Sequence, residues 1–280
     1  MSVLGSIWQS VYRIFLALAI VVIAMVAIRF GVLPFVFNVF GVADESAGVI
    51  RHLAMILTIS GGYGLAVWLI ERRAPSELRF DGRAISLSGL LGVISLIIPL
   101  AALWWLGCFR VTQVSMGQNL ASIALIILGA ALLEEVVFRA IIFRYLKQYV
   151  GLITALALPS IIFSLLHFFN SNVGGWTSFI SVTLLGILWS LIYLITQNVW
   201  AATLNHAAWN FTIVLSGLPL TGQQDWRGAA PLQTEAVGPT LWTGGDMGPE
   251  NSILVIFVVG AVIVGLAFLV RRKLRKIDRL

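Results

Sequence analysis

Residues 131–139, Ala-Leu-Leu-Glu-Glu-Val-Val-Phe-Arg, place two adjacent carboxylates and one arginine in a run that is otherwise almost wholly apolar. The run extends from Ala121 to Phe143 and is long enough to cross a bilayer as a helix. Ionisable side chains at membrane depth are costly and usually mark functional sites. The stretch therefore predicts a transmembrane helix that contributes to a polar site, and other residues should converge on Glu134 and Glu135.

The composition is that of a membrane protein. Of the 280 residues, 59% are hydrophobic and 11% are charged, and the mean hydropathy is +0.98, whereas soluble domains have about 25% charged residues. Apolar runs near the ~20 residues that a spanning helix needs lie at about 14–38, 53–70, 87–109, 119–143, 151–170, 177–196, 199–220 and 252–270. We therefore predict an all-α fold, a polytopic membrane bundle of about eight transmembrane helices with an intramembrane polar cavity.

The basic residues predict how the bundle is oriented. If the N-terminus lies in the cytoplasm, 13 of the 18 Lys and Arg side chains fall in cytoplasmic segments and 3 in outer loops, in agreement with the positive-inside rule. We therefore predict a multi-pass protein in the lipid bilayer with both termini in the cytoplasm. The net charge of +6 then needs no nucleic-acid partner. The single cysteine, Cys108, excludes an intrachain disulfide.

We expect three regions along the chain. Residues 1–118 hold the first three helices, with a cytoplasmic interfacial segment near 71–87. Residues 119–220 hold helices four to seven and the unusual polar groups. Residues 221–280 hold an outer loop, the eighth helix and a basic cytoplasmic tail. The loop is polar and rich in Gly and Pro, and we expect it to be passive rather than a lid or a substrate contact.

Helical phase separates the two glutamates of the opening stretch. Adjacent residues project about 100° apart around a helix, so Glu134 and Glu135 face different neighbours. Glu135 lies four residues before Arg139, which is the favoured order for a helical ion pair. Pairing of Glu135 with Arg139 leaves Glu134 free to face a cavity, with Phe138 one turn away on the same face.

Two further helices carry polar groups that can do chemistry. His167 lies in the fifth predicted helix, and His206 and Asn210 share one face of the seventh. A carboxylate and a histidine can hold and deprotonate water, while a second histidine and an amide can donate hydrogen bonds to an oxyanion. The same groups can instead bind a divalent metal such as zinc, with glutamate as base. A proton-relay transporter and a structural polar network are further alternatives.

The order of these motifs resembles that of a known family. E-E-x-x-x-R ends at Arg139, F-x-x-x-H spans Phe163 to His167, and H-x-x-x-N spans His206 to Asn210. On successive hydrophobic helices they resemble the CPBP family of CAAX proteases and bacteriocin-processing membrane proteins, often labelled Abi. This family is related to the type II CAAX prenyl endopeptidases.

The resemblance implies an eight-helix intramembrane endopeptidase with its catalytic core in residues 119–220 and a prokaryotic cytoplasmic membrane as its location. Carried over position by position, it implies that Glu134 and His167 activate water and that His206 and Asn210 stabilise the oxyanion. The supporting residues that it implies are Glu135, Phe138, Arg139 and Phe163.

The family is described both as metalloproteases and as proteases that use a glutamate without metal. If a metal is bound, its expected ligands are Glu134, His167 and His206. We favour glutamate-activated water, because only two intramembrane histidines are available and one is wanted for the oxyanion. The expected substrate is a hydrophobic or membrane-associated peptide or protein. A non-enzymatic immunity or scaffold protein of the same family is the alternative, and the oligomeric state is not predicted.

The expected helix ends leave one inconsistency in depth. At 1.5 Å per residue, Glu134 lies ~15 Å from Arg144, and His167 lies ~24 Å from Gly151. His167 is then about 10 Å deeper than the other site residues. A first turn of the fifth helix that lies at the membrane interface removes this difference, and we expect that arrangement.

Overall fold

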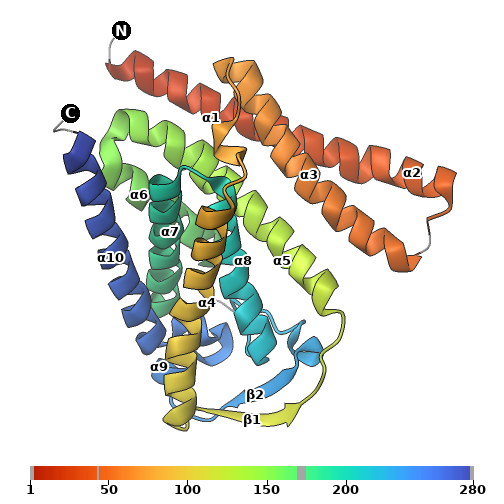
Figure 1. Ribbon diagram of the computed structural model, residues 1–280, viewed down its shortest axis with the longest axis vertical. Helices are drawn as coiled ribbons and strands as arrows, with labels where there is room; N and C mark the ends of the chain where they lie inside the picture. The colour runs from red at the N-terminus through yellow and green to blue at the C-terminus, as the bar shows by residue number, and fades with distance from the viewer. Residues whose placement is uncertain (1–2, 43, 169–174, 278–280) are drawn as a thin grey trace.

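The computed structural model describes residues 3–42, 44–168 and 175–277 and is built almost wholly of helices (Figure 1). Its main elements are α1 (Val3–Val26), α2 (Leu33–Phe40), α3 (Asp44–Glu71), α4 (Gly82–Trp105), β1 (Phe109–Val114), α5 (Leu120–Glu135), α6 (Arg144–Phe168), α7 (Trp176–Thr196), α8 (Val199–Ser216), β2 (Leu232–Ala236), α9 (Thr240–Thr243) and α10 (Ile253–Ile277). Two π-helical segments, η1 (Ala27–Val32) and η3 (Val136–Phe143), join α1 to α2 and α5 to α6. The predicted all-α bundle is confirmed.

Within the described residues, six helical stretches are long and apolar enough to span a membrane, and the chain is an integral membrane protein. About eight transmembrane helices were expected from the eight apolar runs of the sequence, and the difference from six has two causes. The fourth and fifth runs form one helical stretch, Leu120–Phe168. The seventh run, α8, is less apolar because it carries Asn205, His206 and Asn210. The polar side chains of the candidate site therefore lower the hydropathy of their own helix.

The stretch Leu120–Phe168 reverses direction at Gly151. This glycine has a φ of 77°, which other residues rarely adopt. The rings of Phe138 and Phe163 lie 5.1 Å apart between centroids, whereas a straight helix would separate these positions by ~37 Å. The two arms therefore form a hairpin whose tip is Gly151.

This hairpin corrects the expected helix ends. The first arm continues beyond Arg144 to residue 150, so both arms are measured from the tip. Glu134 lies 17 residues before Gly151 and His167 lies 16 residues after it, which corresponds to ~25 Å and ~24 Å along the two arms. The two side chains therefore lie at the same depth. A longer fourth helix, and not an interfacial first turn of the fifth, resolves the inconsistency.

α8 lies between α4, α5 and α7 near the centre of the bundle (Figure 1). The Asn198 side chain caps its first turn by accepting a backbone N–H at 3.0 Å, and Gly217 ends it with a φ of 70°. A Cβ on Gly92 of α4 would lie 2.4 Å from the carbonyl oxygen of Asn205. The two backbones are in direct contact, as small residues allow between membrane helices, and this fixes the position of α8.

The two chain ends lie at one end of the bundle and a two-stranded sheet lies at the other (Figure 1). The sheet pairs β1 with β2 in antiparallel register and was not expected. We call residues 217–252, which join α8 to α10, the α8–α10 segment. It contains β2, α9 and the 3-10 turns η4 (Arg227–Ala229), η5 (Gly245–Met247) and η6 (Pro249–Asn251). The expected passive loop is thus a folded structure.

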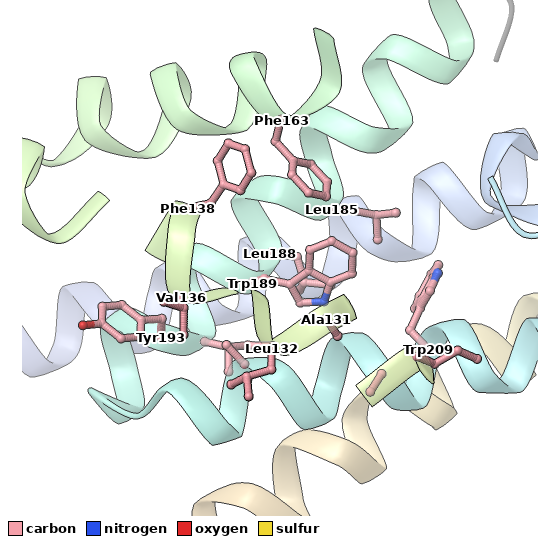
Figure 2. Packing of buried hydrophobic residues seen from close by; sticks show 14 of the residues in the cluster. Ala131, Leu132, Val136, Phe138, Phe163, Leu185, Leu188, Trp189, Tyr193 and Trp209 are labelled. Carbon is pink, nitrogen blue, oxygen red and sulfur yellow. The ribbon is translucent and has the colours of Figure 1, made fainter. Parts of the chain in front are cut away.

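Large apolar side chains fill the space between the hairpin and α7 (Figure 2). Phe163 meets Phe138 edge to face at 5.1 Å and Trp189 at 6.0 Å between ring centroids. All three rings are buried. These contacts hold the helices in the positions from which the polar side chains project.

Candidate active site

A cavity of about 140 Å³ lies between α5, α6, α7, α8 and the α8–α10 segment. It is large enough for several water molecules. The four residues proposed for catalysis come from three helices and all line it. The lining residues are Ala130, Glu134, Phe163, His167, Val182, Leu185, Trp189, His206, Asn210, Leu220, Thr221, Gln223, Trp226 and Glu250. The structure thus brings together the polar groups that the motifs single out.

The two adjacent glutamates differ as helical phase predicts. The Glu134 side chain is 31% exposed and lines the cavity. The Glu135 side chain is fully buried and accepts a hydrogen bond from Arg139 Nη1 at 2.9 Å. The π-helix η3 begins directly after Glu135, and such segments are frequent at functional sites. Glu134 is therefore the carboxylate that can contact water in the cavity.

Glu135 also contacts His206 directly, which the sequence did not predict. Its Oε1 atom lies 2.9 Å from His206 Nδ1, so the same oxygen bridges the histidine and Arg139. Arg139 Nη2 in turn donates to the carbonyl oxygen of Gly186 on α7 at 3.0 Å. One buried network therefore joins α5, η3, α7 and α8, and Glu135 does more than neutralise Arg139.

A stacked tryptophan also orients His206. Its ring stacks on Trp189 with centroids 3.6 Å apart and an interplanar angle of 14°. Trp189 is fixed by its own hydrogen bond from Nε1 to Asn205 Oδ1 at 3.0 Å. Because Nδ1 of His206 faces Glu135, Nε2 faces Glu134, 3.6 Å from its Oε2 atom. That distance is too long for a hydrogen bond, and it leaves Nε2 free for a ligand.

His167 approaches the cavity from the second arm of the hairpin. Its Nδ1 lies 2.9 Å from the carbonyl oxygen of Phe163. A carbonyl only accepts hydrogen bonds, so Nδ1 carries the proton and Nε2 of the neutral ring is an acceptor. The ring also packs on Phe163 with centroids 4.3 Å apart. His167 is thus oriented by its own helix.

Arg139 is surrounded by aromatic rings. Its guanidinium carbon lies 5.1 Å from the ring centroid of Phe163, 5.3 Å from that of Trp189 and 5.9 Å from that of Phe138. Cation–π attraction strengthens when the cation is desolvated, and the arginine is only 1% exposed. The phenylalanines of the first two motifs therefore help to stabilise the buried charge.

Glu250 is a cavity residue that sequence reasoning missed. It lies in η6, directly before α10, and is 2% exposed. Its Oε2 atom accepts hydrogen bonds from the backbone N and the hydroxyl of Thr221 at 2.9 and 2.8 Å, and Oε1 accepts one from Trp209 Nε1 at 3.3 Å. Burial raises the pKa of Glu250, although these hydrogen bonds act in the opposite direction. The only feature of the sequence that could have indicated Glu250 is that it is a glutamate beside an apolar run.

The residues were also tested for a metal site. In residues 3–42, 44–168 and 175–277, no three His, Cys, Asp or Glu side chains are grouped as a metal ion requires. Of the three expected ligands, His206 and His167 use Nδ1 for Glu135 and for a backbone carbonyl, which leaves Nε2 of each ring as the nitrogen that a metal would take. The donor atoms of Glu134, His167 and His206 are therefore suitable for a metal, but the side chains are not grouped closely enough to hold one as they lie.

Part of the chain is similar to a known protein family. Residues 116–212 match the family model described as type II CAAX prenyl endopeptidase Rce1-like. The matched region begins just before α5 and ends within α8, so that it contains the four proposed catalytic residues and excludes Glu250. No curated protein and no solved structure matched the chain. Residues 116–212 of this integral membrane protein are therefore similar to the type II CAAX prenyl endopeptidase Rce1-like family.

Proposed function

We propose that this protein is an intramembrane endopeptidase in which Glu134 activates a water molecule. The observation that carries the proposal is the meeting of Glu134, His167, His206 and Asn210 in one cavity inside the helical bundle. The related family supports a CAAX-protease-like peptidase acting on a membrane-associated substrate. The assignment of roles to single residues is our own.

Glu134 and His167 would prepare the nucleophile. The unprotonated Nε2 of His167 and the Glu134 carboxylate both accept hydrogen bonds, so together they can hold a water molecule by its two hydrogens. Glu134 takes one proton as the water oxygen attacks the carbonyl carbon of the peptide bond. It then returns that proton to the leaving nitrogen as the carbon–nitrogen bond breaks.

His206 and Asn210 would stabilise the oxyanion. The Glu135 carboxylate holds Nδ1–H of His206, and in the imidazolium form Nε2–H can donate to the developing negative charge. The Asn210 side-chain amide has no hydrogen bond to another described residue and lines the cavity, so it is free to donate as well. With His206 protonated, the positive charges of His206 and Arg139 balance the negative charges of Glu134 and Glu135.

The test is peptide hydrolysis by purified protein in proteoliposomes. We expect Glu134→Gln to lower kcat by about 10²–10⁴, the usual contribution of a general base, without changing the unfolding temperature in detergent. Glu235→Gln is the matched control, because Glu235 is an exposed carboxylate outside the cavity. Undiminished hydrolysis by Glu134→Gln would show that the assignment is wrong.

The proposed mechanism uses no metal. Elemental analysis of the active protein, together with its activity after dialysis against a chelator, tests this directly. We expect no stoichiometric metal and no loss of activity. A stoichiometric divalent metal whose removal abolishes hydrolysis would instead assign Glu134, His167 and His206 as ligands after a rearrangement of their side chains.

One observation favours the non-enzymatic alternative. The cavity of about 140 Å³ is smaller than the ~300–1,000 Å³ of typical ligand sites, so a longer stretch of peptide fits inside only if a wall moves. An immunity or scaffold protein needs no such movement. It predicts that Glu134→Gln leaves the biological role of the protein intact, whereas the peptidase predicts its loss.

The orientation in the membrane also stays a proposal. We propose that both termini face the cytoplasm of a prokaryotic cell, because the basic residues are concentrated at the end of the bundle where the two chain ends lie. A fluorescent-protein fusion at each end tests it, since the fluorophore should mature only on the cytoplasmic side.

A further inference from the structure

The α8–α10 segment forms one wall of the catalytic cavity. Five of the fourteen lining residues belong to it, namely Leu220, Thr221, Gln223, Trp226 and Glu250. All five lie outside residues 116–212, the part of the chain that matches the family model. The catalytic groups and this wall therefore come from different parts of the chain.

One buried residue fixes this wall to the transmembrane helices. The Glu250 carboxylate accepts hydrogen bonds from Thr221 and from Trp209 of α8. The Glu250 carbonyl oxygen accepts a hydrogen bond from the Ser181 hydroxyl of α7. Glu250 therefore links the start of the segment, its end and two helices that line the cavity.

The wall is compact as well as anchored. A Cβ on Gly248 would lie 2.0 Å from the carbonyl oxygen of Pro219, so the two ends of the segment touch through their backbones. Trp226 and Leu220 present bulky side chains to the cavity. This packing explains why the cavity is small, although the catalytic groups come from three different helices.

We propose that the α8–α10 segment, held by Glu250, is the specificity-determining wall of the site and restricts cleavage to peptides with small side chains beside the scissile bond. Glu250 is then a positioning residue, which acts through the wall and not on the reacting atoms. The inference rests on the proposed peptidase function. A carboxylate that makes three hydrogen bonds cannot be removed without loosening the wall, because hydrogen bonds to charged groups are the stronger ones.

The first test measures how firmly Glu250 holds the α8–α10 segment, and it does not require enzymatic activity. In hydrogen–deuterium exchange, we expect Glu250→Ala to increase the opening of residues 217–252 by about tenfold or more, with protection of α7 and α8 retained. Thr221→Val removes only the hydroxyl donor and should increase opening less. Glu235→Gln, an exposed carboxylate in the same segment, should change nothing. Unchanged exchange of the segment in both Glu250→Ala and Thr221→Val overturns the proposal.

The second test measures specificity. Versions of a hydrophobic peptide that the wild type cleaves are made with alanine or with leucine on both sides of the scissile bond. We expect the wild type to favour alanine by at least about tenfold in kcat/KM. Glu250→Ala should reduce this preference by about tenfold, chiefly through a lower KM for the leucine peptide, and Glu250→Gln should restore part of it.

The outcomes distinguish a failure of this inference from a failure of the proposed peptidase function. If Glu134→Gln retains hydrolysis, the proposed function fails and the inference fails with it. If Glu134→Gln is inactive but the alanine preference is absent, or is the same in wild type and Glu250→Ala, only the inference about the wall is wrong. Should Glu250→Ala not fold, Thr221→Val and Glu250→Gln carry the same comparison with smaller expected changes.

Discussion

The Oε1 atom of Glu135 lies 2.9 Å from His206 Nδ1 and 2.9 Å from Arg139 Nη1. One carboxylate oxygen thus joins a histidine of α8 to an arginine of η3. A buried carboxylate is tolerated when it is paired and hydrogen-bonded, and here both partners can be cationic. The contact also determines which nitrogen of His206 faces the cavity. The orientation of a proposed catalytic group therefore depends on its neighbour in the first motif.

Glu135→Gln should strongly destabilise the protein, although glutamine and glutamate have nearly the same shape. Arg139 would stay buried without its counter-charge, which typically costs about 3–5 kcal/mol. We expect a lower unfolding temperature in detergent together with a lower kcat. Glu235→Gln is the control, because Glu235 pairs with Arg110 at 3.3 Å on the surface, where ion pairs contribute about 0–1 kcal/mol. Equal unfolding temperatures in the two variants would contradict this account.

Asn210→Ala should affect the chemical step and leave binding nearly unchanged. Loss of one oxyanion donor typically lowers kcat by about 10²–10³, and KM changes little when a contact forms only in the transition state. The measurement is steady-state kinetics on one peptide. Thr212→Val is the matched control on α8, since its hydroxyl donates to the Ala208 carbonyl of its own helix and does not line the cavity. A raised KM with unchanged kcat would place Asn210 in substrate binding instead.

The parts of the site that the sequence predicted follow from short-range helical geometry. Glu135 and Arg139 pair because residues four apart share a face of a helix, and the same phase directs Glu134 to the cavity. The motifs on α6 and α8 could be found in the same way. Each signal lies within one or two helical turns, where periodicity is informative.

The parts that were missed depend on contacts between distant segments. Glu250 receives its hydrogen bonds from Thr221 and Trp209, which lie 29 and 41 positions earlier, and no local pattern indicates them. The pairing of β1 with β2 is equally long-range. The fifth helix was expected to begin near Gly151, as it does, but the fourth was expected to end near residue 143. Hydropathy does not show how far a helix continues beyond its last apolar residue.

Gly186→Ala should destabilise the packing of α6 against α7. A Cβ there would lie 2.8 Å from Ser160 Cβ and 3.0 Å from Ser160 Cα, so the helices must separate. The movement also displaces the carbonyl that accepts from Arg139. Overpacking of this kind costs about 1–3 kcal/mol, visible as a lower unfolding temperature. Gly61→Ala on α3 is the control, because no atom lies within 4 Å, and it should stabilise by roughly 0.5–1 kcal/mol. Two variants of equal stability would contradict the prediction.

Glu77 should make the stability of the protein depend on acid pH. It lies in the 3-10 turn η2 (Ser76–Leu78), between α3 and α4 and outside the membrane spans. Its two carboxylate oxygens accept hydrogen bonds from Arg73 Nη1 and Nη2 at 3.0 and 2.5 Å. Burial, the largest single effect, raises the pKa of Glu77. The hydrogen bonds from Arg73, a backbone hydrogen bond and the charges of Arg144 and Arg73 together outweigh burial and hold the pKa below its usual value.

A carboxyl group whose pKa is lower in the folded than in the unfolded protein stabilises the fold above the unfolded value of about 4.3. That stabilisation is lost as the pH falls through the folded value. We therefore expect Glu77→Gln to lower the unfolding temperature at pH 7 by roughly 2–4 °C, the shift that about 1 kcal/mol produces in a chain of this size. The difference from wild type should shrink as the pH falls below about 4. The measurement is thermal unfolding in detergent across this pH range. A difference that stays constant from pH 7 to pH 3 would mean that packing, and not the charge on Glu77, stabilises the turn.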